Sequence, residues 1–201
     1  MQLTQKFDQA SRWAHELHGA QDRKGTGRPY IGHLLSVCAI VLQYGGDEEQ
    51  AIAALLHDAA EDRGGRPLLE QIERRFGARV AAIVEGCTDT FDTPRPPWRQ
   101  RKKNYVAHVA AASPDVRLVS AADKLSNVRE ITQDYRQAGE AVWERFSGKR
   151  DGTLWYYRAL AGAFRAAPPD ARRGSQLAAL IDELARAVRE LEALAGRPAN
   201  R

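Results

Sequence analysis

The chain has 201 residues, of which 43% are hydrophobic and 28% are charged, and it carries a net charge of +4. This length fits one compact domain with a sizeable core, so we predict a single domain over 1–201 with a motif-bearing core at about 5–165. Abundant Ala, Leu, Arg and Glu favour an all-α fold. The mild basicity suits a polyanionic ligand but excludes the dense positive charge of a dedicated nucleic-acid binder.

Cysteine usage and the N-terminal residues predict the compartment. Cys38 and Cys87 lie far apart in apolar surroundings, as expected for two buried, reduced thiols. The N-terminus has no apolar signal core, and no apolar run approaches the ~20 residues that span a bilayer. We therefore expect a cytoplasmic protein that does not contact a membrane.

Hydrophobic periodicity predicts a series of helices separated by Gly and Pro breaks. In chain order the expected helices run from about Thr4 to His18, from Ile31 to Leu42, from Asp47 through AALLHDAAED (53–62), from Leu68 to Phe76, through Val80 and Val84, from near Arg99, along 116–131, from Val142 to Phe164, and over about 173–195. Asp47 and Gln50 form a capping-box pattern. The longest predicted loops are GAQDRKGTGRPY (19–30) and the basic stretch that begins FDTPRPPW (91–98).

The last predicted helix has leucines and alanines at alternating spacings of three and four residues. This seam is shorter than the three to four heptads that indicate a coiled coil. We expect the helix to pack on its own domain, and a homodimer formed through it is the alternative.

The stretch AALLHDAAED raises the first functional question. On a wheel of about 100° per residue, the apolar side chains gather on one side, and the opposite arc carries His57, Asp58, Glu61 and Asp62. Three crowded carboxylates repel one another unless a cation or a proton compensates. A divalent cation is one solution and a solvated helix end is the other, although acids at a helix C-terminus oppose the helix dipole.

Two further residues fit a metal site. His33 interrupts an apolar helix, and Asp123 lies among apolar neighbours in SAADKLSN. A lone core histidine is often merely hydrogen-bonded, but a buried aspartate requires a partner. Two imidazoles and two carboxylates would suit manganese, iron or another divalent ion better than a closed structural zinc site.

The order H…HD…D resembles that of the HD-domain phosphohydrolases. Together, AHELHGAQDRKGTGRPYIGHLLSV, AALLHDAAED and SAADKLSNVRE are similar to the small stand-alone alarmone hydrolases of the RelA/SpoT homologue class, over about 5–165. The resemblance implies removal of the 3′-diphosphate from ppGpp or pppGpp, with release of pyrophosphate and GDP or GTP. At this length we expect no synthetase, TGS or ACT segment.

The resemblance also implies residue roles. Manganese would be held by His33, His57, Asp58 and Asp123. Glu61 and Asp62 would position or activate the attacking water; we expect Glu61 to orient it and Asp62 to move its proton, and the reverse assignment stays open. Arg23 and Lys24 would face the nucleotide, and Asn127 would line its pocket.

Other contacts are inferred from the residues alone. Tyr30 could stack on the base or simply pack beside Pro29. Basic residues at 101–103, Lys102 above all, could contact the distal phosphates or form a solvated helix end. One of Trp155, Tyr156 and Tyr157 could form a wall of the base pocket, while core packing is the expected role of each.

Two other functions compete with this prediction. The same metal site could act on an adenine alarmone or on NADPH. Alternatively, PRPPWRQRKK could bind nucleic acid or a partner protein in a salt-dependent way, beside a vestigial metal site. The complete set of ligands and acids argues against a binding module, so we do not expect nucleic acid as the partner.

Overall fold

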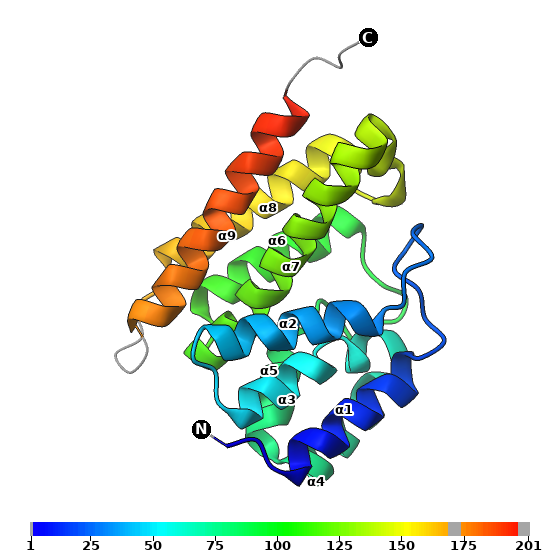
Figure 1. The fold of residues 1–201 in the computed structure, drawn as a ribbon, viewed down its shortest axis with the longest axis vertical. Coiled ribbons are helices and arrows are strands. Elements are labelled where there is room, and N and C mark those ends of the chain that lie inside the picture. Colours follow the sequence, from blue (N-terminus) through cyan, green and yellow to red (C-terminus); the bar gives the residue numbers. More distant parts are fainter. Residues whose placement is uncertain (1, 169–173, 197–201) are drawn as a thin grey trace.

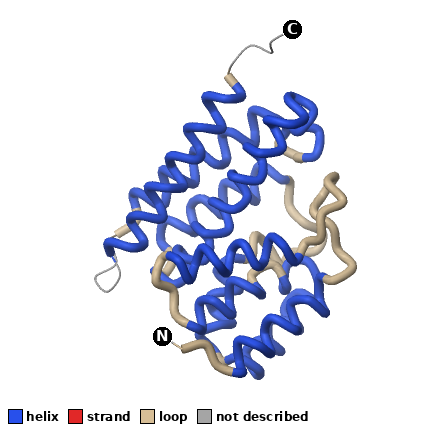
Figure 2. Tube along the Cα trace, in the orientation of Figure 1, coloured by secondary structure: helices blue, strands red, loops and turns tan. Residues whose placement is uncertain are grey.

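The computed structural model describes residues 2–168 and 174–196, and in these ranges every regular element is a helix (Figure 2). The predicted all-α class is confirmed. The elements are α1 (Gln5–His18), α2 (Ile31–Gln43), α3 (Glu48–Leu56), the π-helical turn η1 (Ala60–Gly64), α4 (Gly65–Phe76), α5 (Ala78–Cys87), α6 (Trp98–Ala111), α7 (Pro114–Ala138), the 3₁₀ helix η2 (Gly139–Arg145), α8 (Lys149–Ala166) and α9 (Gly174–Ala195).

Side-chain caps define several helix starts. The Thr4 side chain accepts a hydrogen bond from the Lys6 backbone N–H at the start of α1. The predicted capping box is present, because the Asp47 side chain and the Gln50 side chain each accept from the other residue's backbone N–H.

The helices form two groups that meet along α2 and α7. Figure 1 shows α1 to α5 in one half of the molecule and α6 to α9 in the other, and α2 packs directly on α7. Helix α3 packs against α1, α2, α5 and α7, so its residues from Gln50 to Leu56 are all buried. The end of α3 therefore lies in the interior, at the junction between the two groups.

Helix α9 packs on α7 and α8 of its own chain, as predicted. Its seam residues Leu177, Leu180, Leu184, Ala187 and Leu191 are buried. The homodimer stays a prediction. Cys38 and Cys87 are buried and free, as expected. Among the described helices, none combines the length and the apolarity needed to cross a bilayer.

Two predicted helices are interrupted. AALLHDAAED is not one regular helix, because α3 ends at Leu56 and a π-helical turn follows from Ala60. The His57 ring nitrogen Nδ1 lies 2.8 Å from the Ala54 carbonyl oxygen, which the Asp58 N–H would bind in a continuing α-helix. Local side-chain bonds of this kind compete with the helical ladder.

The prediction of one helix from Val142 to Phe164 is also wrong. The 3₁₀ helix ends at Arg145, Phe146 is extended, and α8 begins only at Lys149. At Gly148 a Cβ atom would lie 2.5 Å from the Trp98 ring, so this connection is shaped by a side chain from α6. Periodicity within 142–164 carries no information about that contact.

Candidate active site

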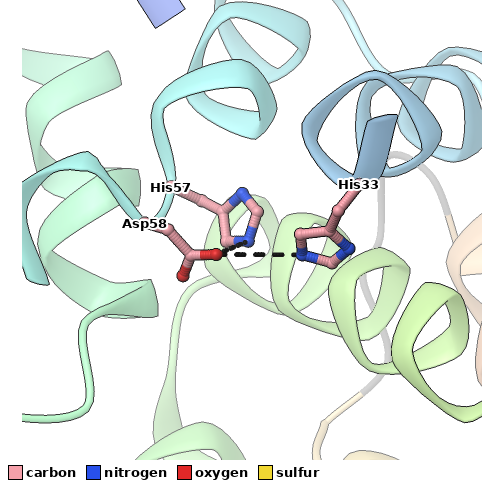
Figure 3. A group of neighbouring side chains, drawn as sticks. All are labelled: His33, His57 and Asp58. Atoms are coloured by element: carbon pink, nitrogen blue, oxygen red, sulfur yellow. Dashed lines mark ion pairs between the residues drawn. The ribbon is translucent and has the colours of Figure 1, made fainter. Parts of the chain in front are cut away.

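Four predicted metal ligands come together from three elements. His33 lies in the first turn of α2, His57 and Asp58 follow α3, and Asp123 lies in the middle of α7. Figure 3 shows the two imidazole rings and the Asp58 carboxylate pointing toward one another, with Asp58 Oδ2 3.0 Å from His57 Nε2 and 3.8 Å from His33 Nε2. Asp123 Oδ1 lies 3.2 Å from His33 Nε2 and 3.6 Å from His57 Nε2.

The donor set fits a divalent cation. Both histidine side chains are buried, and both Nε2 atoms lack a hydrogen-bond partner. Because a carbonyl oxygen only accepts, the bond to Ala54 places a proton on His57 Nδ1 and turns Nε2 toward the carboxylates. An unsatisfied buried polar atom costs about 1–3 kcal/mol. A cation bound between the rings and the carboxylates would satisfy both nitrogens.

Neighbouring groups keep the two carboxylates ionised. Burial alone would raise the pKa of Asp58, but the adjacent His57 ring lowers it below its usual range. Burial likewise opposes ionisation of Asp123, and the Lys124 ammonium lowers the pKa of that carboxyl. The Tyr30 hydroxyl donates to Asp58 Oδ2 at 2.5 Å, and Asn127 Nδ2 donates to Asp123 Oδ1 at 2.5 Å. Two ionised carboxylates with supporting donors suit a divalent cation.

The π-helical turn carries the two predicted catalytic acids and directs them to different neighbours. Glu61 Oε2 accepts a hydrogen bond from the Asp89 backbone N–H at 3.0 Å, and Glu61 Oε1 lies 3.4 Å from Arg95 Nη1. Burial, with the nearby Asp58 charge, raises the pKa of Glu61 above its ordinary value. Asp62 Oδ2 accepts from Gln21 Nε2 at 3.0 Å, toward the 19–30 loop.

The four predicted metal ligands, His33, His57, Asp58 and Asp123, are called the ligand group below. Beside it lies a cavity of about 310 Å³, which we call the loop cavity. It is bordered by Arg23, Lys24, Tyr30, Asp62, Asn127 and Glu130, among others. Arg23 is held there by an ion pair with Glu130 at 2.7 Å and by donation from its Nη2 to Asn127 Oδ1 at 2.6 Å. Lys24 is exposed. The predicted nucleotide-facing pair therefore combines one guanidinium held by its neighbours with one exposed ammonium.

A second cavity of about 260 Å³, the aromatic cavity, shares Lys24, Asn127, Arg145 and Phe146 with the first. Its cationic border residues are Lys24, Lys102, Lys124 and Arg145, and its aromatic ones are Trp98, Phe146, Tyr156 and Tyr157. Within the described residues, no carboxylate borders this cavity. Four cations and four aromatic rings around one space suit an aromatic polyanion, such as a nucleotide with several phosphates.

The other side chains predicted to contact the substrate differ in whether they border a cavity. The Tyr30 ring stacks on His18 with centroids 5.2 Å apart, and its hydroxyl bonds to the predicted ligand Asp58. Tyr30 also borders the loop cavity, so its contact with the base stays a prediction. Lys102 borders the aromatic cavity, whereas Lys103 is exposed. Tyr156 and Tyr157 border this cavity as well as being buried, and Trp155 does not border it.

Several site residues were missed by sequence reasoning. Lys124 bonds to Asp123, and its position directly after the predicted ligand was an available signal. Glu130, one turn beyond Asn127 on α7, lies 3.6 Å from His33 Nδ1. Asp89 accepts from both Arg101 and Lys102, and its backbone binds Glu61. No local pattern predicts that role, because the partners of Asp89 come from α6 and η1.

Comparison with known proteins identifies the family. The HD domain family model matches residues 10–154, which include all four predicted metal ligands. The chain belongs to the HD domain family. An HD domain implies a divalent metal, and His33, His57 and Asp58, whose ligand atoms lie within 4.8 Å of one another, form a group that could hold one.

Relatives of this HD domain have been named for one activity. A guanosine-3′,5′-bis(diphosphate) 3′-pyrophosphohydrolase of Aquifex aeolicus is 38% identical over 130 residues, which are 65% of this chain and 18% of that protein. The enzyme of that name called MESH1, from Xenopus tropicalis, is 39% identical over 126 residues, which are 61% of this chain and 68% of the relative. The chain thus spans less than a fifth of the first relative and about two thirds of the second.

A solved structure supports the fold assignment over nearly the whole chain. It is described as a metazoan ortholog of SpoT that hydrolyses ppGpp and plays a role in starvation responses. It superposes with a TM-score of 0.73 at 26% identity and covers 92% of this chain and 97% of that one. The resemblance seen in the sequence motifs therefore extends to the arrangement of helices in space.

Proposed function

We propose that this HD domain is a metal-dependent 3′-pyrophosphohydrolase that removes the 3′-diphosphate of ppGpp and pppGpp and releases pyrophosphate with GDP or GTP. The observation that carries the proposal is the pair of buried, unpartnered histidine Nε2 atoms facing two ionised carboxylates. The cation-lined cavities beside this group and the names of the relatives support the substrate class. The cytoplasm is the expected compartment.

The proposed cation ligands are His33, His57, Asp58 and Asp123, and the expected ion is Mn²⁺. When bound, a divalent cation would acidify the attacking water and offset the negative charge that builds on the phosphoryl oxygens. Tyr30 and Asn127 orient the two carboxylates through the hydrogen bonds that they donate.

The two acids on η1, Glu61 and Asp62, are assigned to the orientation and the deprotonation of the attacking water. Glu61, held by the Asp89 N–H, orients the water toward the phosphorus that is bonded to the ribose 3′-oxygen. As the new P–O bond forms, the bond from phosphorus to the 3′-oxygen breaks. Asp62 takes one proton from the water and returns it to the leaving 3′-oxygen, which departs as the ribose hydroxyl. Proton transfer by positioned carboxylates contributes typically about 10²–10⁴-fold to such rates.

The cationic walls would hold the phosphates. Arg23 and Lys24 border the loop cavity together with Asp62, so they are assigned to the 3′-diphosphate. Lys102 borders the aromatic cavity and is assigned to the 5′-phosphates, whereas Lys124 bonds to Asp123 and so lies beside the ligand group. Asn127 borders both cavities and lies between the two groups of phosphates.

Product analysis tests the proposal. Purified protein is incubated with ppGpp, pppGpp, ppApp or NADPH, with and without Mn²⁺, beside the variants Asp58→Ala and Glu61→Ala. Pyrophosphate release from the guanine substrates that requires Mn²⁺ and is lost in both variants is expected. Release from ppApp alone, or phosphate release from NADPH alone, would move the activity to those substrates. Absence of turnover with metal bound would refute an enzymatic role.

A further inference from the structure

The aromatic cavity has one wall whose position depends on two glycines far away in sequence. Trp98, the first residue of α6, is half-buried and borders the cavity. A Cβ atom at Gly148 would lie 2.5 Å from Trp98 Cη2, and one at Gly152 would lie 3.2 Å from Trp98 Cζ3. A real Cβ atom needs more room than the first distance allows. The indole can therefore occupy this place only because residue 148 has no side chain, and residue 152 leaves it further room.

Two aromatic side chains contact the Trp98 ring edge-to-face. The Trp98 ring meets Tyr156 at 6.3 Å with an interplanar angle of 69°, and it meets Trp155 at 6.4 Å with an angle of 68°. Edge-to-face contacts of this kind are favourable beyond the area that they bury. Of these two partners, Tyr156 also borders the cavity, whereas Trp155 does not border it and lies under the Arg99 guanidinium.

Cationic side chains border the same cavity as the ring, and two of them are paired with carboxylates outside the cavity lining, Lys102 with Asp89 and Lys124 with Asp123. Lys24, Lys102 and Lys124 border the same cavity, and burial lowers the pKa of Lys102 to about 8, with the Lys124 ammonium adding to the effect. The cavity thus offers a flat aromatic surface beside a cluster of cations.

We propose that Trp98 contacts the substrate directly, by stacking its indole on the nucleobase while the lysines bind the phosphates. This inference rests on the proposed function, because it assigns a residue to the nucleoside part of that substrate. Stacking tolerates any base, since every base has a π-face. Trp98 therefore supplies affinity for the nucleoside without choosing between guanine and adenine, and Gly148 is a positioning residue for Trp98.

Direct calorimetric binding of two ligands tests the assignment. GDP contains the base, and inorganic pyrophosphate does not. In Trp98→Leu, which keeps an apolar side chain against the two glycines, the Kd for GDP is expected to rise about ten-fold or more, since stacking is worth about 1–3 kcal/mol per base. The Kd for pyrophosphate is expected to stay unchanged. Trp98→Phe should retain most of the GDP affinity.

Two further variants distinguish direct contact of Trp98 with the base from the positioning of Trp98 by its neighbours. Gly148→Ala should weaken GDP binding as Trp98→Leu does, and combining the two changes should add little, because both remove one surface. Trp155→Leu is the matched control: it removes an indole that touches Trp98 but does not border the cavity, and it should leave GDP binding within about two-fold.

Three results would overturn the inference: unchanged GDP affinity in Trp98→Leu, equal losses for GDP and pyrophosphate, or the same loss in Trp155→Leu. Failure of the proposed function would be seen separately, as absence of pyrophosphate release from ppGpp by the unaltered protein. The calorimetric comparison does not depend on turnover, so it tests Trp98 in either case.

Discussion

Adding Mn²⁺ to metal-free protein is expected to stabilise the fold through the ligand group at the end of α3. His57 Nε2 and His33 Nε2 are buried without hydrogen-bond partners, 3.0 Å and 3.8 Å from Asp58 Oδ2. The unfolded chain does not hold these atoms together, so the cation binds the folded form. At a free concentration of ~100 times its Kd, it adds about 2.7 kcal/mol to the free energy of unfolding. For a chain of this size, that corresponds to a rise in Tm of roughly 5–11 °C.

Thermal unfolding followed by circular dichroism measures this shift, after chelation and then with increasing Mn²⁺. Asp58→Ala removes a ligand and should abolish the shift. The matched control is Glu70→Ala, which removes an acid that is 68% exposed on α4 and should leave the shift intact. An equal shift in Asp58→Ala and in the unaltered protein would refute the reasoning, because the cation would then bind elsewhere.

The same titration has an expected pH dependence. Although burial opposes protonation of His57, the Asp58 carboxylate raises the pKa of the metal-free ring well above its ordinary value. A proton on Nε2 competes with the cation for the same lone pair. The Mn²⁺-induced rise in Tm should therefore be largest at alkaline pH and shrink as the pH falls. A shift that grew on acidification would contradict this assignment.

Four other outcomes are expected. Lys102, whose pKa burial lowers to about 8, loses its charge as the pH rises, so KM should increase between about pH 7 and 9 in initial-rate assays, and Lys102→Arg should flatten the profile. Glu61→Gln should lower kcat by about 10²–10⁴-fold with little change in KM, and an equal rise in KM would point instead to substrate binding. Arg79→Ala breaks ion pairs to acids of α3 and α7 and should cost roughly 1 kcal/mol in urea unfolding, with the loss diminishing in high salt. Leu184→Ala, at a fully buried position of α9, should cost about 2–5 kcal/mol while kcat at low temperature stays unchanged, because α9 borders neither cavity of the site.

Much of the fold was predictable because its signals are local. The Asp47 capping box and the seam of α9 lie within a few residues of the elements that they define, and both predictions are confirmed. The helix that was expected to continue past Leu56 ends there, and the His57 side chain bonds to the Ala54 carbonyl, a contact that periodicity does not report. The interruption before Lys149 includes Gly148, which packs against Trp98, fifty residues earlier in the chain.

The candidate ligands were identifiable because they are chemically out of place in the sequence. A histidine and acids within apolar helices need partners, and that need is visible without coordinates. By itself, the sequence therefore determined the helical class and the identities of His33, His57, Asp58 and Asp123 as candidates. Their meeting point depends on how α2, α3 and α7 pack.

Only the tertiary structure decided which side chains surround that group. Arg23 reaches Asn127 across 104 positions of the chain, and Asp89, in the loop after α5, joins Glu61 of η1 to Lys102 of α6. The tertiary structure also shows that Tyr30 donates a hydrogen bond to Asp58 and that Trp98 packs against Gly148. Helical periodicity predicts which face of a helix is buried, but it does not predict which other helix packs against that face. The residues that border the two cavities come from different helices, so only the packing of those helices identifies them.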